Sequence, residues 1–291
     1  MDLWEESQKV RDLFELASEA AGFNVRSVLS TGTAEDLAAT DKAQILITLV
    51  NLSAAMVLAE RGIEPAGCAG FSLGEYAALC TAGVLGVEPA FRVVKVRGEL
   101  MEKASRELDA SGGKPGMAAV LGLPAEKAAA VVRGIEGVFV ANHNSPVQLV
   151  LSGTAAGLSL AEERLKAEGA KRVLRLKVSG PFHSPLMEGA RSAFEEALAG
   201  FAFADPVIPV YSNVTAGPIA TGAEARALCV RQVVSPVRWV DEETRLAADG
   251  YREFREAGPG TVLTGLFKAL RPDISCAPAG TLAEIRGAAV R

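Results

Sequence analysis

The sequence has few of the residues on which metal sites, disulfide frameworks and acid–base catalysis depend. Histidine occurs only as His143 and His183, and the four cysteines include no Cys-x-x-Cys pair. We therefore expect no metal site and no cofactor, with free thiols in a reducing cytoplasm. A serine nucleophile usually needs a histidine as its base, so the scarcity of histidine also narrows the search for a catalytic base.

Basic runs and long apolar runs are also missing. The net charge of -5 has no basic segment to offset it, which argues against a nucleic-acid partner. The most apolar stretch, Ile45 to Ala59, is interrupted by Asn51 and Ser53 and is expected to be too short to span a bilayer. The first six residues are acidic, unlike an export signal. We expect a cytoplasmic protein without membrane contact, and a monomer as the simplest state.

One stretch, residues 69–76, predicts a short strand, a sharp turn and the start of a helix, with Ser72 at the apex. Gly70 and Gly74 flank the serine at two residues on each side, which lets strand and helix approach closely. Gly-x-Ser-x-Gly alone is weak, and an ordinary Gly/Ser turn is the alternative. The small residues of 66–69 and the helical composition of 75–80 favour a nucleophile at Ser72.

The base must come from one of the two histidines. His183 lies in Pro181-Phe182-His183-Ser184-Pro185 at an expected domain boundary, whereas His143 lies inside the expected insert. We therefore favour His183 as the base. The alternative is that His183 is an ordinary surface-loop histidine. Asp109 is the only aspartate between Ser72 and His183. A plain Ser-His-Asp triad is therefore not supported. A Ser-His dyad whose histidine is oriented by a backbone carbonyl would serve the same purpose.

The order of expected elements predicts an α/β fold with an insert. Strands at 117–123, 138–142, 148–152 and 171–179, with helices at 124–134 and 154–169, form a β-α-β-β-α-β unit typical of a ferredoxin-like fold. A Gly-rich linker at 111–116 precedes it. Elsewhere strands, including 207–210 and 251–257, alternate with helices, which implies a mostly parallel sheet. We expect an α/β-hydrolase-like domain from residues 1–114 and 181–291, with a ferredoxin-like subdomain over 115–180.

Seven motifs occur in one order along nearly the whole chain and closely resemble those of malonyl-CoA:acyl-carrier-protein transacylases. Acyltransferase domains of polyketide and fatty-acid synthases are relatives of that family. The motifs are Gly70-Phe71-Ser72-Leu73-Gly74-Glu75, Val96-Arg97-Gly98-Glu99-Leu100-Met101, Asn142-His143-Asn144-Ser145-Pro146, Pro181-Phe182-His183-Ser184, Tyr211-Ser212-Asn213-Val214, Gln232-Val233-Val234-Ser235-Pro236-Val237-Arg238-Trp239 and Gly258-Pro259-Gly260.

The resemblance implies a role for several residues of the catalytic machinery. Ser72 would be the nucleophile and His183 its base, and the backbone carbonyl of Gln232 would orient His183. The amide of Leu73 would be one oxyanion donor. Arg97 would hold the free carboxylate of malonyl-CoA, although most helix arginines are simply solvated.

The resemblance also implies substrate contacts and a partner. Phe182 matches the form associated with malonyl rather than branched units, and Asn142 and Asn144 would line the cleft. The partner would be an acyl carrier protein, with coenzyme A thioester as substrate, in fatty-acid or polyketide synthesis or as a malonate decarboxylase subunit. Carrier proteins are acidic, so basic residues are docking candidates, although scattered solvated charges explain them equally well; they are Arg172, Arg175, Lys177, Arg231 and Arg238.

The sequence departs from the family pattern in two places, which keeps two rival functions open. Phe71 stands where the family usually has histidine. Met1-Asp2-Leu3-Trp4 corresponds to a point just beyond the strand and Gly-Gln-Gly turn with which the family begins, a turn that supplies a second oxyanion donor. Losing one such donor costs on the order of 10²–10³ in rate. A non-catalytic acyl-CoA or carrier-protein binding module and a thioesterase are therefore the alternatives.

Overall fold

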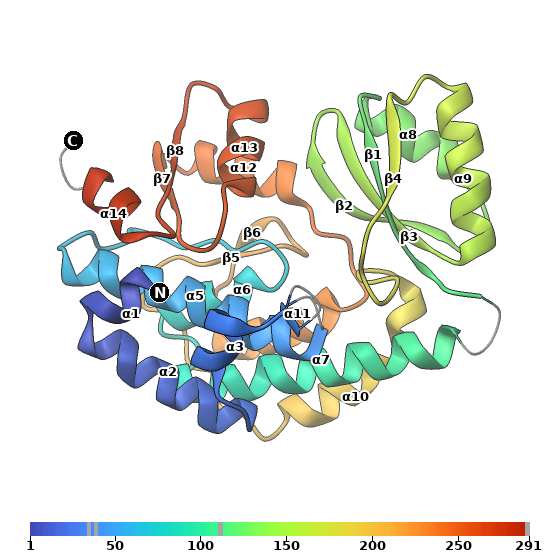
Figure 1. Ribbon diagram of the computed structural model, residues 1–291. Helices are drawn as coiled ribbons and strands as arrows, with labels where there is room; N and C mark the ends of the chain where they lie inside the picture. Colours follow the sequence, from blue (N-terminus) through green and yellow to red (C-terminus); the bar gives the residue numbers. More distant parts are fainter. Residues whose placement is uncertain (34–35, 38–39, 110–112, 289–291) are drawn as a thin grey trace.

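The structure is a computed structural model that describes residues 1–33, 36–37, 40–109 and 113–288. Part of the expected linker at 111–116 lies outside these residues. Figure 1 shows most of the helices in the lower part of the view and the largest sheet at the upper right. The helices are α1 (Asp2–Glu6), α2 (Gln8–Ala21), α3 (Val25–Thr31), α5 (Thr40–Glu60), α6 (Gly74–Thr81), α7 (Val87–Asp109), α8 (Ala125–Val132), α9 (Ala155–Ala167), the 3-10 helix η1 (Pro185–Met187), α10 (Glu188–Leu198), α11 (Gly222–Gln232), α12 (Trp239–Ala248), α13 (Val262–Leu270) and α14 (Leu282–Ala288). The strands are β1 (Gly116–Leu121), β2 (Val138–Ser145), β3 (Gln148–Gly153), β4 (Arg172–Arg175), β5 (Tyr211–Ser212), β6 (Gly217–Pro218), β7 (Glu253–Glu256) and β8 (Ser275–Pro278).

Local sequence signals explain where several helices begin and end. The Ser7 hydroxyl caps α2 by accepting a hydrogen bond from the Val10 amide, and Gly22 ends that helix with a φ of 79°. Thr154 and Thr221 cap α9 and α11 in the same way. In α7 the apolar residues recur at helical spacing, so one face is buried in the largest core cluster, and that face carries Arg97 inward.

Helix α5 is the central helix of the body and is longer than the apolar run suggested. It extends over Thr40–Glu60, so the expectation that this segment is too short to span a bilayer is wrong for the helix as a whole. Residues 42–60 are long and apolar enough to cross a membrane by length and composition, with a mean hydropathy of 1.6. Its leucines Leu46, Leu49 and Leu52 are nevertheless buried in the protein core. That packing is typical of a core helix.

The six elements expected between residues 115 and 180 are present in the expected order, and they build the largest sheet. Its strand order is β2-β3-β1-β4, with antiparallel pairs throughout. Alternation along β1 sends Ala118 and Val120 into a core shared with α8 and α9. Met117 and Ala119 face the other way, into a smaller cluster that Phe182 packs against. The second face of the sheet therefore supports the loop that carries His183.

The parallel sheet expected for the rest of the chain is present in the described residues only as short pairings. Parallel pairing there consists of β7 with β8 and two isolated bridges, Cys68 with Val210 and Asn142 with Val237. The strand expected at 207–210 is reduced to the first of these bridges. Pro206 and Pro209 cannot donate to a ladder, and the facing segment must turn at Gly70 to form the elbow. Strand β7 lies inside the range expected for 251–257.

One buried carboxyl group of α12 is expected to destabilise the folded protein. Glu243 is fully buried, and neither carboxyl oxygen has a hydrogen-bond partner within the described residues. Burial raises its pKa to about 8. The unfolded chain loses this proton near pH 4.5 and the folded protein only near pH 8, so rising pH between these values favours unfolding.

We therefore expect Glu243→Met to raise the free energy of unfolding by about 1–3 kcal/mol at pH 7. The gain should be larger at pH 8 than at pH 5, because the penalty of the acid grows over that interval. Urea unfolding at both pH values measures it, with Glu253→Gln as the control because the side chain of Glu253 is 79% exposed. An equal gain at both pH values would contradict this explanation.

Candidate active site

Ser72 occupies a strained turn between an extended segment and helix α6. Its φ of 50° is in the left-handed region, which a residue other than glycine rarely adopts. Gly70 allows the turn, since a Cβ there would lie 2.2 Å from the carbonyl carbon of Gly74. The elbow predicted from the sequence is therefore present, with the Ser72 side chain at its apex.

His183 reaches the serine from the loop that precedes η1. The Ser72 Oγ and the His183 Nε2 are 2.7 Å apart, and the His183 Nδ1 lies 2.9 Å from the backbone oxygen of Gln232. A carbonyl oxygen can only accept, so Nδ1 carries the proton and Nε2 is left to accept the serine hydroxyl proton. The contacts that the family resemblance implies among these three residues are present. His143 lies on β2, where its amide donates to Val237.

Gln232 also connects the elbow to Arg97 through its side chain. Its Nε2 donates to the backbone oxygen of Ser72 at 3.1 Å and to the Glu75 Oε2 at 3.0 Å. Its Oε1 accepts from Arg97 at 3.2 Å, and a second Arg97 nitrogen donates to the Gln44 Oε1 at 2.9 Å. Arg97 is buried, and its Nε has no hydrogen-bond partner in the described part of the chain. A buried guanidinium with spare donors is suited to binding a carboxylate.

Sequence reasoning missed a second set of residues behind the elbow. Asn213, which follows β5, accepts a hydrogen bond from the Ser72 amide at 2.6 Å and donates to the Gly70 oxygen at 2.8 Å. Glu75 and Glu242 contact the same asparagine. Asn213 stands in one of the recognised motifs and Glu75 directly follows the elbow glycine, which were the available signals. Glu242 and Gln44 carried no signal in the sequence.

The other predicted site residues lie around this centre with fewer contacts. Leu73 follows Ser72 at the start of α6, as an oxyanion donor requires. Phe182 precedes His183, and its backbone oxygen accepts a hydrogen bond from Ser152. Asn142 and Asn144 are buried on β2, and within the described residues neither hydrogen-bonds to Ser72, His183 or Arg97. Their place in a cleft stays a prediction.

Phe71, the residue that departs from the family pattern, packs against an aromatic cluster. Its ring meets Trp239 edge-on with centroids 5.4 Å apart, and Trp239 meets Phe267 in the same manner. The phenyl ring is partly buried. The aromatic side chain at this position thus anchors one side of the elbow to α12 and α13 through apolar contact.

Comparison with known proteins decides the family. A family model described as "Acyl transferase domain" matches residues 1–283. The chain belongs to the acyl transferase domain family. A malonyl CoA-acyl carrier protein transacylase of Bacillus subtilis is 40% identical over 271 residues, which is 92% of this chain and 84% of that protein. One of Escherichia coli K12 is 38% identical over 265 residues, 90% of this chain and 84% of that protein.

Solved structures resemble this acyl transferase domain over almost its whole length. The malonyl CoA-acyl carrier protein transacylase of Coxiella burnetii superimposes with a TM-score of 0.93 at 31% identity, covering 99% of this chain and 90% of that one. A malonyl-transacylase in complex with its type II PKS acyl-carrier protein also gives 0.93, at 33% identity, covering 99% of this chain and 93% of that one. The α/β fold is therefore shared with these structures.

The electrostatics of the site favour a neutral His183 in this acyl transferase domain. Burial, and then the charge of Arg97, lower its pKa from 6.5 to about 4, which the hydrogen bond to Gln232 opposes. Neutral imidazole is the form that accepts a proton, so the base is competent at pH 7. Between pH 6.5 and 4 the unfolded chain binds the proton more readily than the folded protein. His183 therefore lowers the free energy of unfolding as the pH falls through that range.

We expect the rate at which a fluorophosphonate modifies Ser72 to stay level down to about pH 5. It should fall tenfold per pH unit below about pH 4, because protonation then removes the base. Single-turnover measurements after a rapid pH jump, with circular dichroism at each pH to confirm folding, would test this. An acid limb centred near pH 6.5 would show that His183 is not shielded as described.

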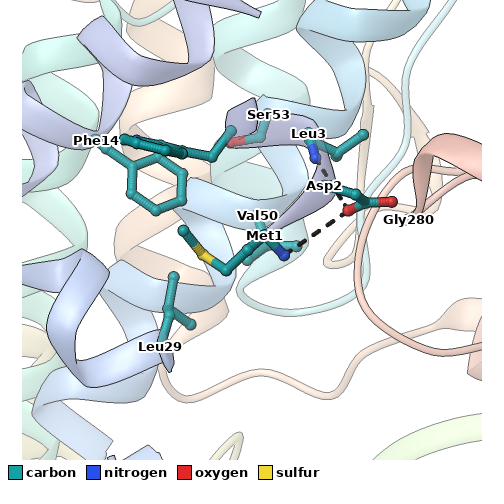
Figure 2. A pocket seen from close by; sticks show the side chains of 9 residues that line it. Met1, Asp2, Leu3, Phe14, Leu29, Val50, Ser53 and Gly280 are labelled. Atoms are coloured by element: carbon teal, nitrogen blue, oxygen red, sulfur yellow. Dashed lines mark hydrogen bonds and ion pairs between the residues drawn. The ribbon is translucent and has the colours of Figure 1, made fainter. Parts of the chain in front are cut away.

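A separate cavity of about 140 Å³ lies beside the first helix of the acyl transferase domain (Figure 2). None of the residues named above for the active site lines it; its lining is Met1, Asp2, Leu3, Trp4, Phe14, Leu29, Val50, Ser53 and Gly280. In the described part of the chain, no group of three or more His, Cys, Asp and Glu side chains could hold a metal ion.

Proposed function

We propose that this protein transfers a malonyl group from malonyl-CoA to the phosphopantetheine thiol of an acyl carrier protein. The observation that carries the proposal is the continuous hydrogen-bonded path from Ser72 through His183 and Gln232 to the buried Arg97. It joins a nucleophile and its base to a cation that can select a carboxylate. The likeness to relatives named malonyl CoA-acyl carrier protein transacylase supports the same reaction.

The reaction proceeds as two acyl transfers through a serine ester. The Ser72 Oγ attacks the thioester carbonyl while the His183 Nε2 takes its proton, and the coenzyme A thiolate leaves with that proton. His183 then takes the proton of the incoming carrier-protein thiol, whose sulfur attacks the malonyl ester, and His183 returns that proton to the Ser72 Oγ as the ester bond breaks. The Ser72 amide is already bound by Asn213, so the next amide, that of Leu73, stabilises the oxyanion.

Substrate selection follows from the remaining residues of the site. Arg97 binds the malonyl carboxylate with charged hydrogen bonds, and Gln44 and Gln232 keep the guanidinium in place. Phe182 limits substituents at the α-carbon, while Asn142 and Asn144 line the path of the substrate. The protein needs no cofactor, since the coenzyme A is substrate and the phosphopantetheine belongs to the partner.

The domain division is part of the proposal. Residues 115–180 form a ferredoxin-like subdomain, supported by the sheet order β2-β3-β1-β4 and by a core of its own with α8 and α9. Residues 1–114 and 181–291 form the larger, α/β-hydrolase-like domain, supported by the elbow geometry and by a separate core cluster. The active site then lies where the His183 loop leaves the subdomain.

A monomer that docks an acidic carrier protein through basic side chains completes the proposal. Arg172, Lys177 and Arg231 are exposed and form no ion pair within the described residues, which leaves them available. Arg175 forms an ion pair with Glu162 at 3.9 Å, and Arg238 forms one with Asp241 at 2.9 Å. These two arginines are therefore weaker candidates.

One assay tests the function against its two alternatives. The protein is incubated with malonyl-CoA, with and without holo acyl carrier protein, and both proteins are analysed by mass spectrometry. We expect one malonyl group on Ser72 without the carrier and its transfer to the carrier when that is added. Steady release of coenzyme A independent of the carrier would instead indicate a thioesterase, and binding without any serine adduct would indicate a non-catalytic module.

A further inference from the structure

A buried polar network lies behind the elbow, and the reaction steps above leave two of its members without a task. Asn213 and Glu242 are each fully buried, and they contact each other at 2.8 Å. Within the described residues, neither forms a hydrogen bond to His183 or Arg97. The network nevertheless reaches the nucleophile through its backbone.

The Asn213 side chain forms two hydrogen bonds to the backbone of the elbow. Its Oδ1 accepts from the Ser72 amide at 2.6 Å, and its Nδ2 donates to the Gly70 oxygen at 2.8 Å. Ser72 has a φ of 50°, and such a conformation persists only where the surroundings hold it in place. One carboxamide thus supplies both an acceptor and a donor to the strained turn that aims the Ser72 hydroxyl at His183.

Glu242 determines which way that carboxamide points. The second hydrogen of the Asn213 Nδ2 is donated to the Glu242 Oε2. If the carboxamide were flipped, its amino group would face the Ser72 N–H, and its oxygen would face the Gly70 oxygen and Glu242. Two donors would then face each other, and acceptors would face acceptors. A buried carboxyl is unfavourable, and the Glu242 Oε1 has no partner within the described residues. The contact with Asn213 is therefore the interaction that accounts for an acid at this place.

Glu75 connects the same network to the base. Its Oε2 accepts from the Asn213 backbone amide at 2.9 Å and from the Gln232 Nε2 at 3.0 Å. Gln232 in turn orients His183 through its backbone oxygen. The residue that holds the nucleophile and the residue that holds the base therefore share one carboxylate.

We propose that Asn213 is a positioning residue for Ser72, and that Glu242 keeps its carboxamide in the orientation that holds the elbow. The inference rests on the proposed function only in taking Ser72 as the nucleophile. Its effect is on the alignment of Ser72 with His183, where a shift of 1 Å can cost about 10²-fold in rate.

The experiment compares four variants of the full chain: Asn213→Leu, Glu242→Met, Glu242→Gln and Glu243→Met. Glu243 is the matched control, because it neighbours Glu242 on α12, is equally buried and, within the described residues, makes no hydrogen bond to Asn213. The first readout is the rate at which a fluorophosphonate modifies Ser72 with loss of fluoride. The second is kcat and KM for malonyl-CoA, and thermal unfolding monitors the fold.

We expect Asn213→Leu to slow fluorophosphonate labelling by about 10–100-fold and Glu242→Met by about 10-fold, with KM for malonyl-CoA changed less than about threefold. Glu242→Gln should keep the wild-type rate within about threefold, since its amide oxygen still accepts from Asn213. Glu243→Met should react like the wild type.

Equal labelling of Glu242→Met and Glu243→Met would overturn the inference. So would an Asn213→Leu variant whose loss of rate matches its loss of folded protein. The two proposals fail separately: a wild type that labels rapidly but transfers no malonyl group refutes the proposed function, while the ranking of the variants still decides the role of Asn213 and Glu242.

Discussion

Ser72→Ala is expected to abolish malonyl transfer, with a loss of about 10⁶-fold in kcat, the size seen when a serine nucleophile is removed from a catalytic dyad or triad. The physical reason is that, among the described residues, no other side-chain hydroxyl hydrogen-bonds to the His183 ring. Its oxygen is 2.7 Å from the His183 Nε2, and the turn that presents it is held through Gly70 and Asn213. Release of coenzyme A and the mass of the intact protein measure the result.

A surface serine provides the control for this loss. Ser159 is exposed on α9, where its hydroxyl donates to a backbone oxygen of its own helix. Ser159→Ala should retain the wild-type rate and the malonyl adduct. A malonyl adduct that persists in Ser72→Ala at the wild-type level would place the nucleophile elsewhere.

The second large effect concerns substrate choice through Arg97. Charged hydrogen bonds contribute about 1.5–3 kcal/mol each, so two of them to a carboxylate correspond to about 10²–10⁴-fold. We expect Arg97→Ala to lower kcat/KM for malonyl-CoA by that factor and to change acetyl-CoA much less. Arg97→Lys should fall between the two, because an ammonium cannot bind a carboxylate in the bidentate manner.

Comparing the two thioesters separates binding of the carboxylate from an effect on the base. Arg97 also contacts Gln232, whose backbone orients His183. If malonyl-CoA and acetyl-CoA lose activity equally in Arg97→Ala, the arginine acts through Gln232 rather than on substrate. Arg92→Ala is the control on the same helix, since Arg92 is exposed and paired with Glu88 four residues away.

Local sequence patterns were sufficient where one segment determines its own conformation. The elbow at Ser72 was predictable because a glycine at 70 permits a close approach of the backbone that a side chain there would block. The order of elements between residues 115 and 180 was predictable because each helix and strand has its own periodicity. The extent of the parallel sheet could not be predicted, since pairing depends on neighbouring strands, and proline at 206 and 209 limits that pairing.

Roles that depend on distant contacts could not be predicted from spacing. The Ser72–Asn213 hydrogen bond joins residues 141 positions apart, and the Gln232 side chain reaches Ser72 across 160 positions. A lone Asn or Gln at such a distance has no periodic signature. Family motifs brought His183 and Gln232 to attention, but they assigned no role to Asn213.

Local properties were enough to predict the nucleophile turn and the histidine that could serve it, because glycine geometry and the scarcity of histidine are evident from the residues themselves. Helical spacing instead groups Arg97 with the polar residues of its helix, and its burial on the inner face became evident only in the folded protein. The groups that surround these residues come from distant parts of the chain and are brought together by folding. The buried carboxyls Glu75 and Glu242 became relevant when folding removed them from water, and one oxygen of each accepts a hydrogen bond from Asn213. These hydrogen bonds place Asn213 between the two acids, where its Oδ1 accepts from the Ser72 amide.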